Sequence, residues 1–330
     1  ENLSNDLLHT EFIPAIYTML SARVNKKLSY KAGLRGEFST VTLKSSHENV
    51  NERNNAFFLA PSISATYAPD ERQEFSLAFS RRISRPTYPQ LNPYMSMIDA
   101  TTYEQGNMHL NFEKTTKLDL SYNLQKESLQ LYANGYVNYT DDYITQITTL
   151  GSNILTTTYI NADYDLKTGA EFSLKVTPAK WLDISLGSNT YYVSAKSNYS
   201  SVEISNSGVS NNSNLTLDFL PAKNTNIQVQ YFINSPQYHP QFTTSFTHQA
   251  NIGIKQQMIK DKMILSLLVT DILDTSRWKV VSCDQLFKLT NTSRNKSRML
   301  WLGASYNFNS FKQRKTQKNE EDRSLIKFGM

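Results

Sequence analysis

The sequence has almost no cysteine and no long apolar run. Its single cysteine, Cys283, has no second cysteine to pair with, so no internal disulfide holds the fold together. The longest apolar run covers residues 263–272 and is broken by Ser266, Thr270 and Asp271, whereas a membrane-spanning helix needs roughly 18 apolar residues in succession. These scarcities exclude a disulfide-stapled secreted domain and a protein that crosses a membrane with helices. A transmembrane β-barrel stays possible, because its strands alternate apolar and polar residues.

The residue sets of common catalytic and metal sites are missing as well. The five histidines are scattered, without the His-x-x-x-His or Cys-x-x-Cys spacing of a metal site. Neither a Gly-x-Ser-x-Gly nucleophile motif nor a phosphate-binding glycine loop occurs in the sequence. We therefore expect no enzymatic activity, no cofactor and no metal. The net charge of +5 is partly concentrated in residues 312–318. No nucleic-acid-binding motif accompanies this segment, so we expect a solvated tail and no nucleic-acid partner.

What the sequence does have is strand-like alternation along most of its length. Residues 75–83 show it clearly, with Phe75, Leu77 and Phe79 on one face and Ser76 and Ser80 on the other. The same period predicts about thirteen strands, at residues 16–24, 28–38, 57–67, 75–83, 118–124, 129–139, 164–176, 182–195, 215–219, 227–233, 243–256, 262–273 and 296–309.

The expected connections differ at the two ends of these strands. Turns of a few residues are expected at one end. At the other, loops are expected over residues 84–112, 140–162, 196–213 and 274–295, with the strands around 140–162 extended as a hairpin. Residues 1–11 and 44–55 are expected to be polar loops. Short periplasmic turns and long external loops are typical of outer-membrane barrels.

The stretch from Ser80 to Pro93, SRRISRPTYPQLNP, followed by YEQGNMHLNFEKT, resembles a signature of the TonB-dependent receptor superfamily in Bacteroidota. The second half departs from that signature, with Gln105 in place of an acid and Met108 in place of a proline. Further matching pieces are residues 32–37, 270–275 and 302–308.

The resemblance implies an all-β antiparallel transmembrane β-barrel of about twenty-two strands behind an N-terminal plug. It also implies uptake of a scarce solute, such as a chelate, oligosaccharide or peptide, powered through TonB. Neither the plug nor a TonB box is in this sequence. An odd number of strands does not close a bacterial barrel, so residues 1–309 are interpreted as the C-terminal part of an incomplete barrel and 310–330 as a charged periplasmic tail.

Two sets of candidate functional residues follow. For ligand binding, the outer loop offers Arg82, Arg85, Tyr88, Asn92 and Tyr94, because binding residues are commonly carried on loops held by a rigid scaffold. For assembly, the last strand carries Trp301, Gly303, Tyr306 and Phe308, which resemble the terminal signal read by the barrel-assembly machinery.

The expected setting is the outer membrane of a Gram-negative bacterium, with membrane lipid, lipopolysaccharide, TonB and a small solute as partners. Arg81 is the residue expected to face lipopolysaccharide phosphates, because its guanidinium group matches their geometry. Three alternatives stay open: a passive, structural or adhesin-type barrel, an outer-membrane enzyme, and a soluble all-β protein.

Overall fold

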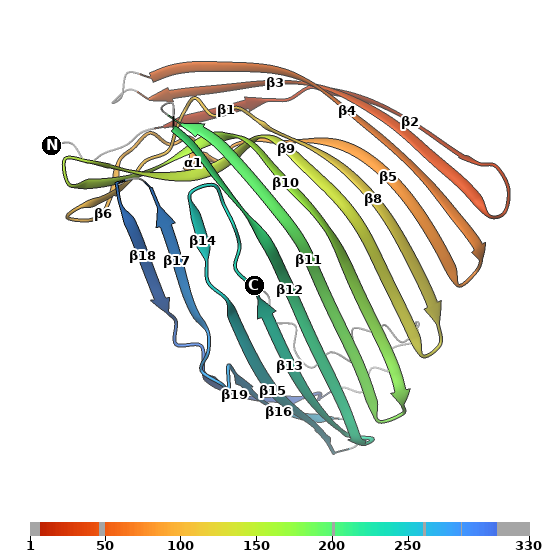
Figure 1. The fold of residues 1–330 in the computed structure, drawn as a ribbon. Helices are drawn as coiled ribbons and strands as arrows, with labels where there is room; N and C mark the ends of the chain where they lie inside the picture. The colour runs from red at the N-terminus through yellow and green to blue at the C-terminus, as the bar shows by residue number, and fades with distance from the viewer. Residues whose placement is uncertain (1–6, 46–49, 200–201, 260–261, 285, 309–330) are drawn as a thin grey trace.

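The computed structural model describes residues 7–45, 50–199, 202–259, 262–284 and 286–308 (Figure 1). The tail expected at 310–330 lies outside these residues. The helix α1 (Tyr88–Leu91) is a single turn. Within the described ranges, no helix is both long and apolar enough to span a bilayer.

One large curved antiparallel sheet forms the body of the molecule (Figure 1). β1 and β2 both pair with β3 on the same side, so they form one strand interrupted at Ile13 and Pro14. The main path then has thirteen positions, which confirms the expected number. Its strands are β1 (Leu8–Phe12) with β2 (Ala15–Arg23), β3 (Leu28–Ser45), β4 (Val50–Asp70), β5 (Gln73–Ser84), β8 (Glu113–Lys126), β9 (Leu129–Gly151), β10 (Ile154–Ala179), β11 (Leu182–Tyr199), β12 (Val202–Ala222), β13 (Thr225–Asn234), β15 (Thr247–Met258), β16 (Met263–Thr270) and β19 (Met299–Tyr306).

The sheet does not close on itself. In the described part of the chain β19 pairs only with β16, and β1 and β2 pair only with β3. The fold is therefore that of an incomplete antiparallel barrel, as the alternation predicted.

Strand register separates an apolar face from a polar face across the whole sheet. Leu77 lies opposite Leu120, and Leu131, Ile184 and Leu267 lie on the same apolar face in the strands that follow. The polar row alternates with it: the Asn134 amide donates to Asp119 at 3.0 Å, and the Gln228 amide donates to Asp218 at 2.8 Å. We refer to the polar face as the luminal wall.

Aromatic rings gather on the apolar face beside the short turns. The ring centroids of Tyr67 and Phe75 are 6.5 Å apart, those of Phe75 and Tyr122 are 4.7 Å apart, and those of Trp181 and Phe219 are 6.4 Å apart. This is the arrangement of an interfacial aromatic belt, in which rings sit at headgroup level.

Three of the expected loops are wrong, because the strands continue through them. Residues 8–12 form β1, most of 44–55 belongs to β3 and β4, and most of 196–213 belongs to β11 and β12. The Ser, Thr and Asn residues there hid the strands, since ladder hydrogen bonds need no apolar side chain when both faces are polar. The extended hairpin at 140–162 is confirmed. Its turn puts Ser152 and Asn153 at φ of 52° and 65°, as a tight hairpin turn requires.

The long connections, at the end of the sheet opposite the short turns, contain short helical and strand segments of their own. The β5–β8 loop, residues 85–112, contains α1, β6 (Ser96–Asp99) and β7 (Thr102–Glu104), and β7 pairs with the extended part of β10. The β16–β19 loop, residues 271–298, contains β17 (Arg277–Cys283) and β18 (Lys288–Arg294). These two strands form a separate sheet with β14 (Phe242–Thr244), which confirms the expected strand-like arms of 274–295.

Candidate functional site

The β5–β8 loop folds back onto the luminal wall. Leu91, Leu110 and Phe112 of the loop are buried in one apolar cluster with Val41 and Leu43 of β3, together with Ile144 of β9. Val41 and Leu43 share a strand face with Glu37, so the cluster lies on the polar side of the sheet. This buried apolar cluster is therefore inside the barrel.

A buried carboxylate fixes the start of this loop. Glu37 of β3 is only 7% exposed and forms ion pairs with two guanidinium groups. Arg35 donates to its Oε2 from Nε at 3.0 Å and from Nη2 at 2.7 Å, while Arg85 pairs with its Oε1. Arg85 also lies over the ring of Phe112, 5.8 Å from its centroid. The candidate ligand residue Arg85 is thus engaged in holding the loop.

The two halves of the signature interlock with each other. Gly106 N donates to Asn92 O at 2.8 Å, and Asn107 N donates to Gln90 O at 2.7 Å. A Cβ atom on Gly106 would lie 2.4 Å from Asn92 O, so only glycine permits this approach. Asn92 also accepts from Tyr94 N through its side chain at 3.2 Å. These contacts shape the loop, and the sequence showed only that both halves were present.

The far end of the loop is held by an amide side chain. Asn161 of β10 accepts from Asn111 N at 2.8 Å and donates to Asn111 O at 3.1 Å, which imitates one rung of a β-ladder. Glu113, the first residue after the loop, accepts from Ile144 N at 2.8 Å.

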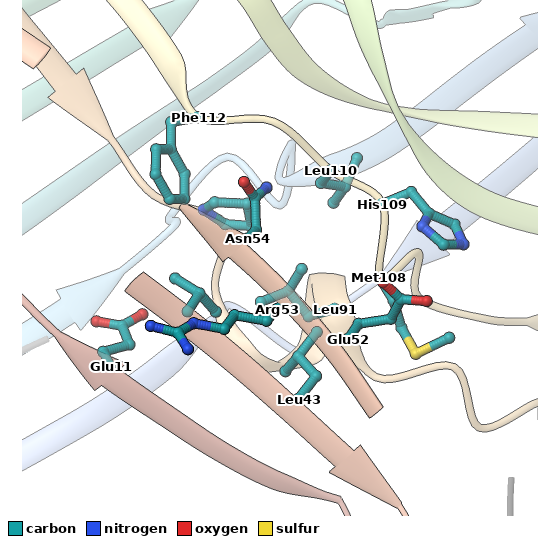
Figure 2. A pocket seen from close by; sticks show the side chains of 12 residues that line it. Glu11, Leu43, Glu52, Arg53, Asn54, Leu91, Met108, His109, Leu110 and Phe112 are labelled. Atoms are coloured by element: carbon teal, nitrogen blue, oxygen red, sulfur yellow. The ribbon is translucent and has the colours of Figure 1, made fainter. Parts of the chain in front are cut away.

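A pocket of about 180 Å³ opens between the loop and β1, β3 and β4 (Figure 2). Its apolar side is Val41, Leu43, Pro86, Leu91, Met108, Leu110 and Phe112, and its polar side is Glu11, Glu52, Arg53, Asn54 and His109. Tyr88 lies nearby, 43% exposed and 6.4 Å from the ring of His9. Mixed walls of this kind suit a small organic molecule with a few polar groups.

Sequence reasoning missed the polar side of this pocket. The sequence predicts polar loops at 1–11 and 44–55, and these contain Glu11, Glu52, Arg53 and Asn54. The register places Glu52 opposite Leu43 and Asn54 opposite Val41, which brings them to the pocket. Only the pairing of the extended strands could have revealed this. Over the described residues, no group of three or more His, Cys, Asp or Glu side chains is arranged to hold a metal.

The remaining predicted residues are elsewhere. Arg82 lines a different hollow, further down the luminal wall. Gly303 lies opposite Ser266, and a Cβ atom there would come 2.5 Å from Ser266 Oγ. The rings of Tyr306 and Phe308 are 4.8 Å apart, while Trp301 is 47% exposed. All four assembly candidates lie in or just after β19, and their recognition by assembly machinery stays a prediction.

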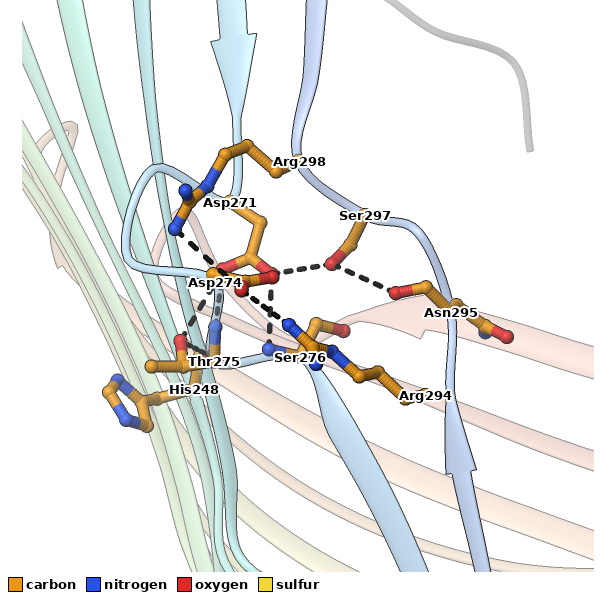
Figure 3. A network of polar contacts seen from close by, with 9 residues as sticks. All are labelled: His248, Asp271, Asp274, Thr275, Ser276, Arg294, Asn295, Ser297 and Arg298. Atoms are coloured by element: carbon orange, nitrogen blue, oxygen red, sulfur yellow. Dashed lines mark hydrogen bonds and ion pairs between the residues drawn. The ribbon is translucent and has the colours of Figure 1, made fainter.

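A second buried carboxylate fixes the start of the β16–β19 loop (Figure 3). Asp271 is fully buried and accepts from Thr275 N at 3.0 Å, Ser276 N at 3.1 Å and Ser297 Oγ at 2.5 Å. Burial acts to raise the pKa of Asp271, but the hydrogen bonds hold it below its ordinary value. Asp274 pairs with Arg294 at 2.6 Å. The matching piece at 270–275 is therefore a structural turn.

The loop between β13 and β15 is also held against the wall. Gln241 accepts from Thr148 N at 2.6 Å and donates to Thr148 O at 2.7 Å, again imitating a ladder rung. His239 stacks on Phe242 with a centroid distance of 4.2 Å and approaches Tyr143 Oη at 3.3 Å. Three outer loops therefore pack against the sheet through buried polar contacts.

This combination of an open antiparallel sheet, a polar inner wall and inward-packed outer loops agrees with a family comparison. The model of the "Outer membrane protein beta-barrel family" matches residues 1–307. The chain belongs to this family. It is accordingly an outer-membrane protein, and the soluble all-β alternative is wrong.

Solved structures share the fold at low sequence identity. The copper transporter OprC superposes with a TM-score of 0.65 at 13% identity, covering 90% of this chain and 50% of OprC. The ferric yersiniabactin uptake receptor FyuA from Yersinia pestis superposes with a TM-score of 0.61 at 13% identity, covering 92% of this chain and 46% of FyuA. The FrpB iron transporter from Neisseria meningitidis superposes with a TM-score of 0.62 at 14% identity, covering 90% of this chain and 46% of FrpB. This chain thus spans about half the length of these structures. No curated protein sequence matches it.

Proposed function

We propose that the protein is an outer-membrane receptor that takes up a scarce solute through a plugged barrel, with energy supplied through TonB. The observation that carries the proposal is the β5–β8 loop, which is held on the luminal wall by Glu37 and Arg85 and frames a pocket at the outer mouth. A loop fixed in this way presents binding groups to the lumen. The fold shared with a copper transporter and a ferric yersiniabactin uptake receptor supports the same function.

The rest of the machinery belongs to the proposal as well. Further strands would complete the barrel between β19 and β1, a plug would fill the lumen, and TonB would bind that plug. Lipopolysaccharide and the barrel-assembly machinery are the proposed envelope partners. Within the loop, the exposed Tyr88 is the proposed ligand contact, together with Arg53 and Glu52 across the pocket. Arg85 and Asn92 are proposed to position the loop.

The test is solute depletion by cells that produce the full-length protein, compared with cells that lack it. Mass spectrometry of a defined medium identifies which solutes disappear, with and without a protonophore. We expect energy-dependent depletion of a small set of solutes, and a several-fold slower rate for Tyr88→Ala at unchanged surface abundance. Trp278→Ala is the matched control, because Trp278 is 50% exposed but belongs to β17 in the β16–β19 loop and not to the β5–β8 loop. Depletion that persists with the protonophore would favour a passive barrel, and no depletion at all would favour an adhesin-type or structural barrel.

A further inference from the structure

A second hollow lies on the luminal wall, separate from the loop pocket. It has a volume of about 520 Å³ and is bounded by strands β2 to β5, β8 and β9. Its floor consists of small residues, Gly33, Ser62, Ser64, Ala78 and Ser80. The register aligns them across three strands, with Gly33 opposite Ser62, Ser62 opposite Ser80, and Ser64 opposite Ala78. Small side chains on neighbouring strands leave space that a ligand can enter.

Three cations stand around this floor. In the register of β5 and β8, Arg82 lies opposite Thr115 and Ser80 lies opposite Lys117. Arg82 and Lys117 therefore occupy diagonal positions, whose backbones are about 7–8 Å apart. Lys31 pairs with Ser64 on the opposite side. Lys117 lies 3.0 Å from Asp119, whereas neither Lys31 nor Arg82 has an ion-pair partner among the residues that the structure describes. The hollow therefore carries three basic groups against one acidic group.

Unpaired cations on a concave wall attract anions, because a low-dielectric cavity focuses their field. Arginine recognises carboxylate and phosphate oxygens through its fork of donors, and serine hydroxyls supply further donors. Around Asp183 and Asp218, which are partners in the strand register, the same luminal face also carries Lys223 and Lys255, so acidic and basic groups are balanced there. The excess of positive charge is thus local to the hollow around Lys31, Arg82 and Lys117.

We propose that the hollow lined by Lys31, Arg82 and Lys117 is an oxyanion-binding site, and that the transported solute carries carboxylate or phosphate groups. The site binds the anionic part of the solute between the two unpaired cations, below the loop pocket. This inference rests on the proposed uptake function, because it assigns the chemical class of the solute.

The experiment is calorimetric titration of the purified full-length protein in detergent micelles. Citrate probes carboxylate binding, pyrophosphate probes phosphate binding, and sucrose serves as a neutral reference. We expect the wild type to bind at least one oxyanion and not sucrose, with affinity that falls as salt is added. The double variant Lys31→Gln with Arg82→Gln should lose at least about tenfold in affinity, because it removes two charge-assisted contacts.

The matched control is Lys175→Gln with Lys255→Gln, which removes two positive charges from strands β10 and β15 of the same luminal face. It should bind as the wild type does. The proposal is overturned if neither oxyanion binds, or if both double variants lose affinity equally. Uptake by cells is measured separately. Energy-dependent depletion of uncharged solutes would overturn this inference alone, and oxyanion binding without any depletion would overturn the uptake function alone.

Discussion

Two outer loops of this protein are each held by one buried carboxylate, but by different chemistry. At the β5–β8 loop, Glu37 meets the guanidinium groups of Arg35 and Arg85. At the β16–β19 loop, Asp271 meets the neutral N–H and O–H donors of Thr275, Ser276 and Ser297. The first loop also buries apolar side chains, whereas the buried apolar residues of the described chain include none from 272–298.

The difference shows what each loop depends on. Charges taken out of water are costly when one partner is removed, because the other charge is left buried. When a carboxylate that is bound only by neutral donors is replaced, the donors lose hydrogen bonds but no oppositely charged group is left buried without a partner. The β5–β8 loop should therefore be rigid and sensitive to single substitutions, as suits a loop that frames a pocket. The β16–β19 loop should tolerate change and open locally.

The largest effect is expected from Glu37→Ala, which leaves Arg35 and Arg85 without their shared acceptor. The free energy of unfolding of the full-length protein should fall by about 3–5 kcal/mol, measured by urea denaturation in detergent micelles. Glu127→Ala, at an exposed turn position, is the control and should change it by less than about 0.5 kcal/mol. Equal effects of the two substitutions would show that the Glu37 ion pairs hold nothing in place.

The next effect tests the apolar part of the comparison. Leu110 is 2% exposed, so Leu110→Ala should cost about 3 kcal/mol through lost burial and the remaining cavity. Leu286 of the other loop is 73% exposed, and Leu286→Ala should be nearly neutral. Hydrogen exchange should show lost protection across the β5–β8 loop for the first variant only. Unchanged protection in that loop would argue against its docking on β3.

A smaller effect is expected from Asp271→Asn. The amide keeps one acceptor oxygen, but its N–H₂ group replaces the other and then faces a donor. That donor is Thr275 N at the Oδ1 position, or Ser276 N and Ser297 Oγ at the Oδ2 position. The change should cost about 1–3 kcal/mol. The loss should be confined to the β16–β19 loop and be seen as faster amide exchange at Thr275 and Ser276. Glu127→Gln, which makes the same acid-to-amide change at an exposed turn position, is the control. Slower folding of the whole barrel would contradict a local role for Asp271.

The smallest expected effect is a dependence of the stability of the β16–β19 loop on pH. The folded state lowers the pKa of Asp271, so the stabilisation from its carboxylate is complete above its unfolded pKa. This stabilisation is lost as the pH falls through the lower pKa that Asp271 has in the folded state. Loosening of the β16–β19 loop is therefore expected below about pH 4, read from exchange protection between pH 7 and pH 3. Asp271→Asn should remove this step, and a variant that keeps it would place the titration on another group.

Much of the architecture was readable from residue order. The alternation of Leu77, Leu120 and Leu131 with polar neighbours fixed the faces of the sheet, because side chains in a strand alternate with period two. The number of strand positions followed as well. The outer strand extensions were not predictable, since the polar residues of 44–55 and 196–213 carry no apolar signal and pair through their backbones. A motif marked Arg85 and Asn92 as candidate ligand-binding residues, but only the tertiary structure shows that they make contacts that hold the loop.

The sequence by itself determined the alternation of the strands and the position of the long β5–β8 loop, because these depend on local period and on the proline at position 86. Tertiary structure alone decided that this loop turns inward and that Glu37, 48 residues before Arg85 in the sequence, becomes its ion-pair partner. It also decided that Glu11 and Glu52 face one pocket, and that Lys31, Arg82 and Lys117 surround one hollow. Strand register brings each of these sets of residues together, and register is a property of paired backbones that no single segment contains.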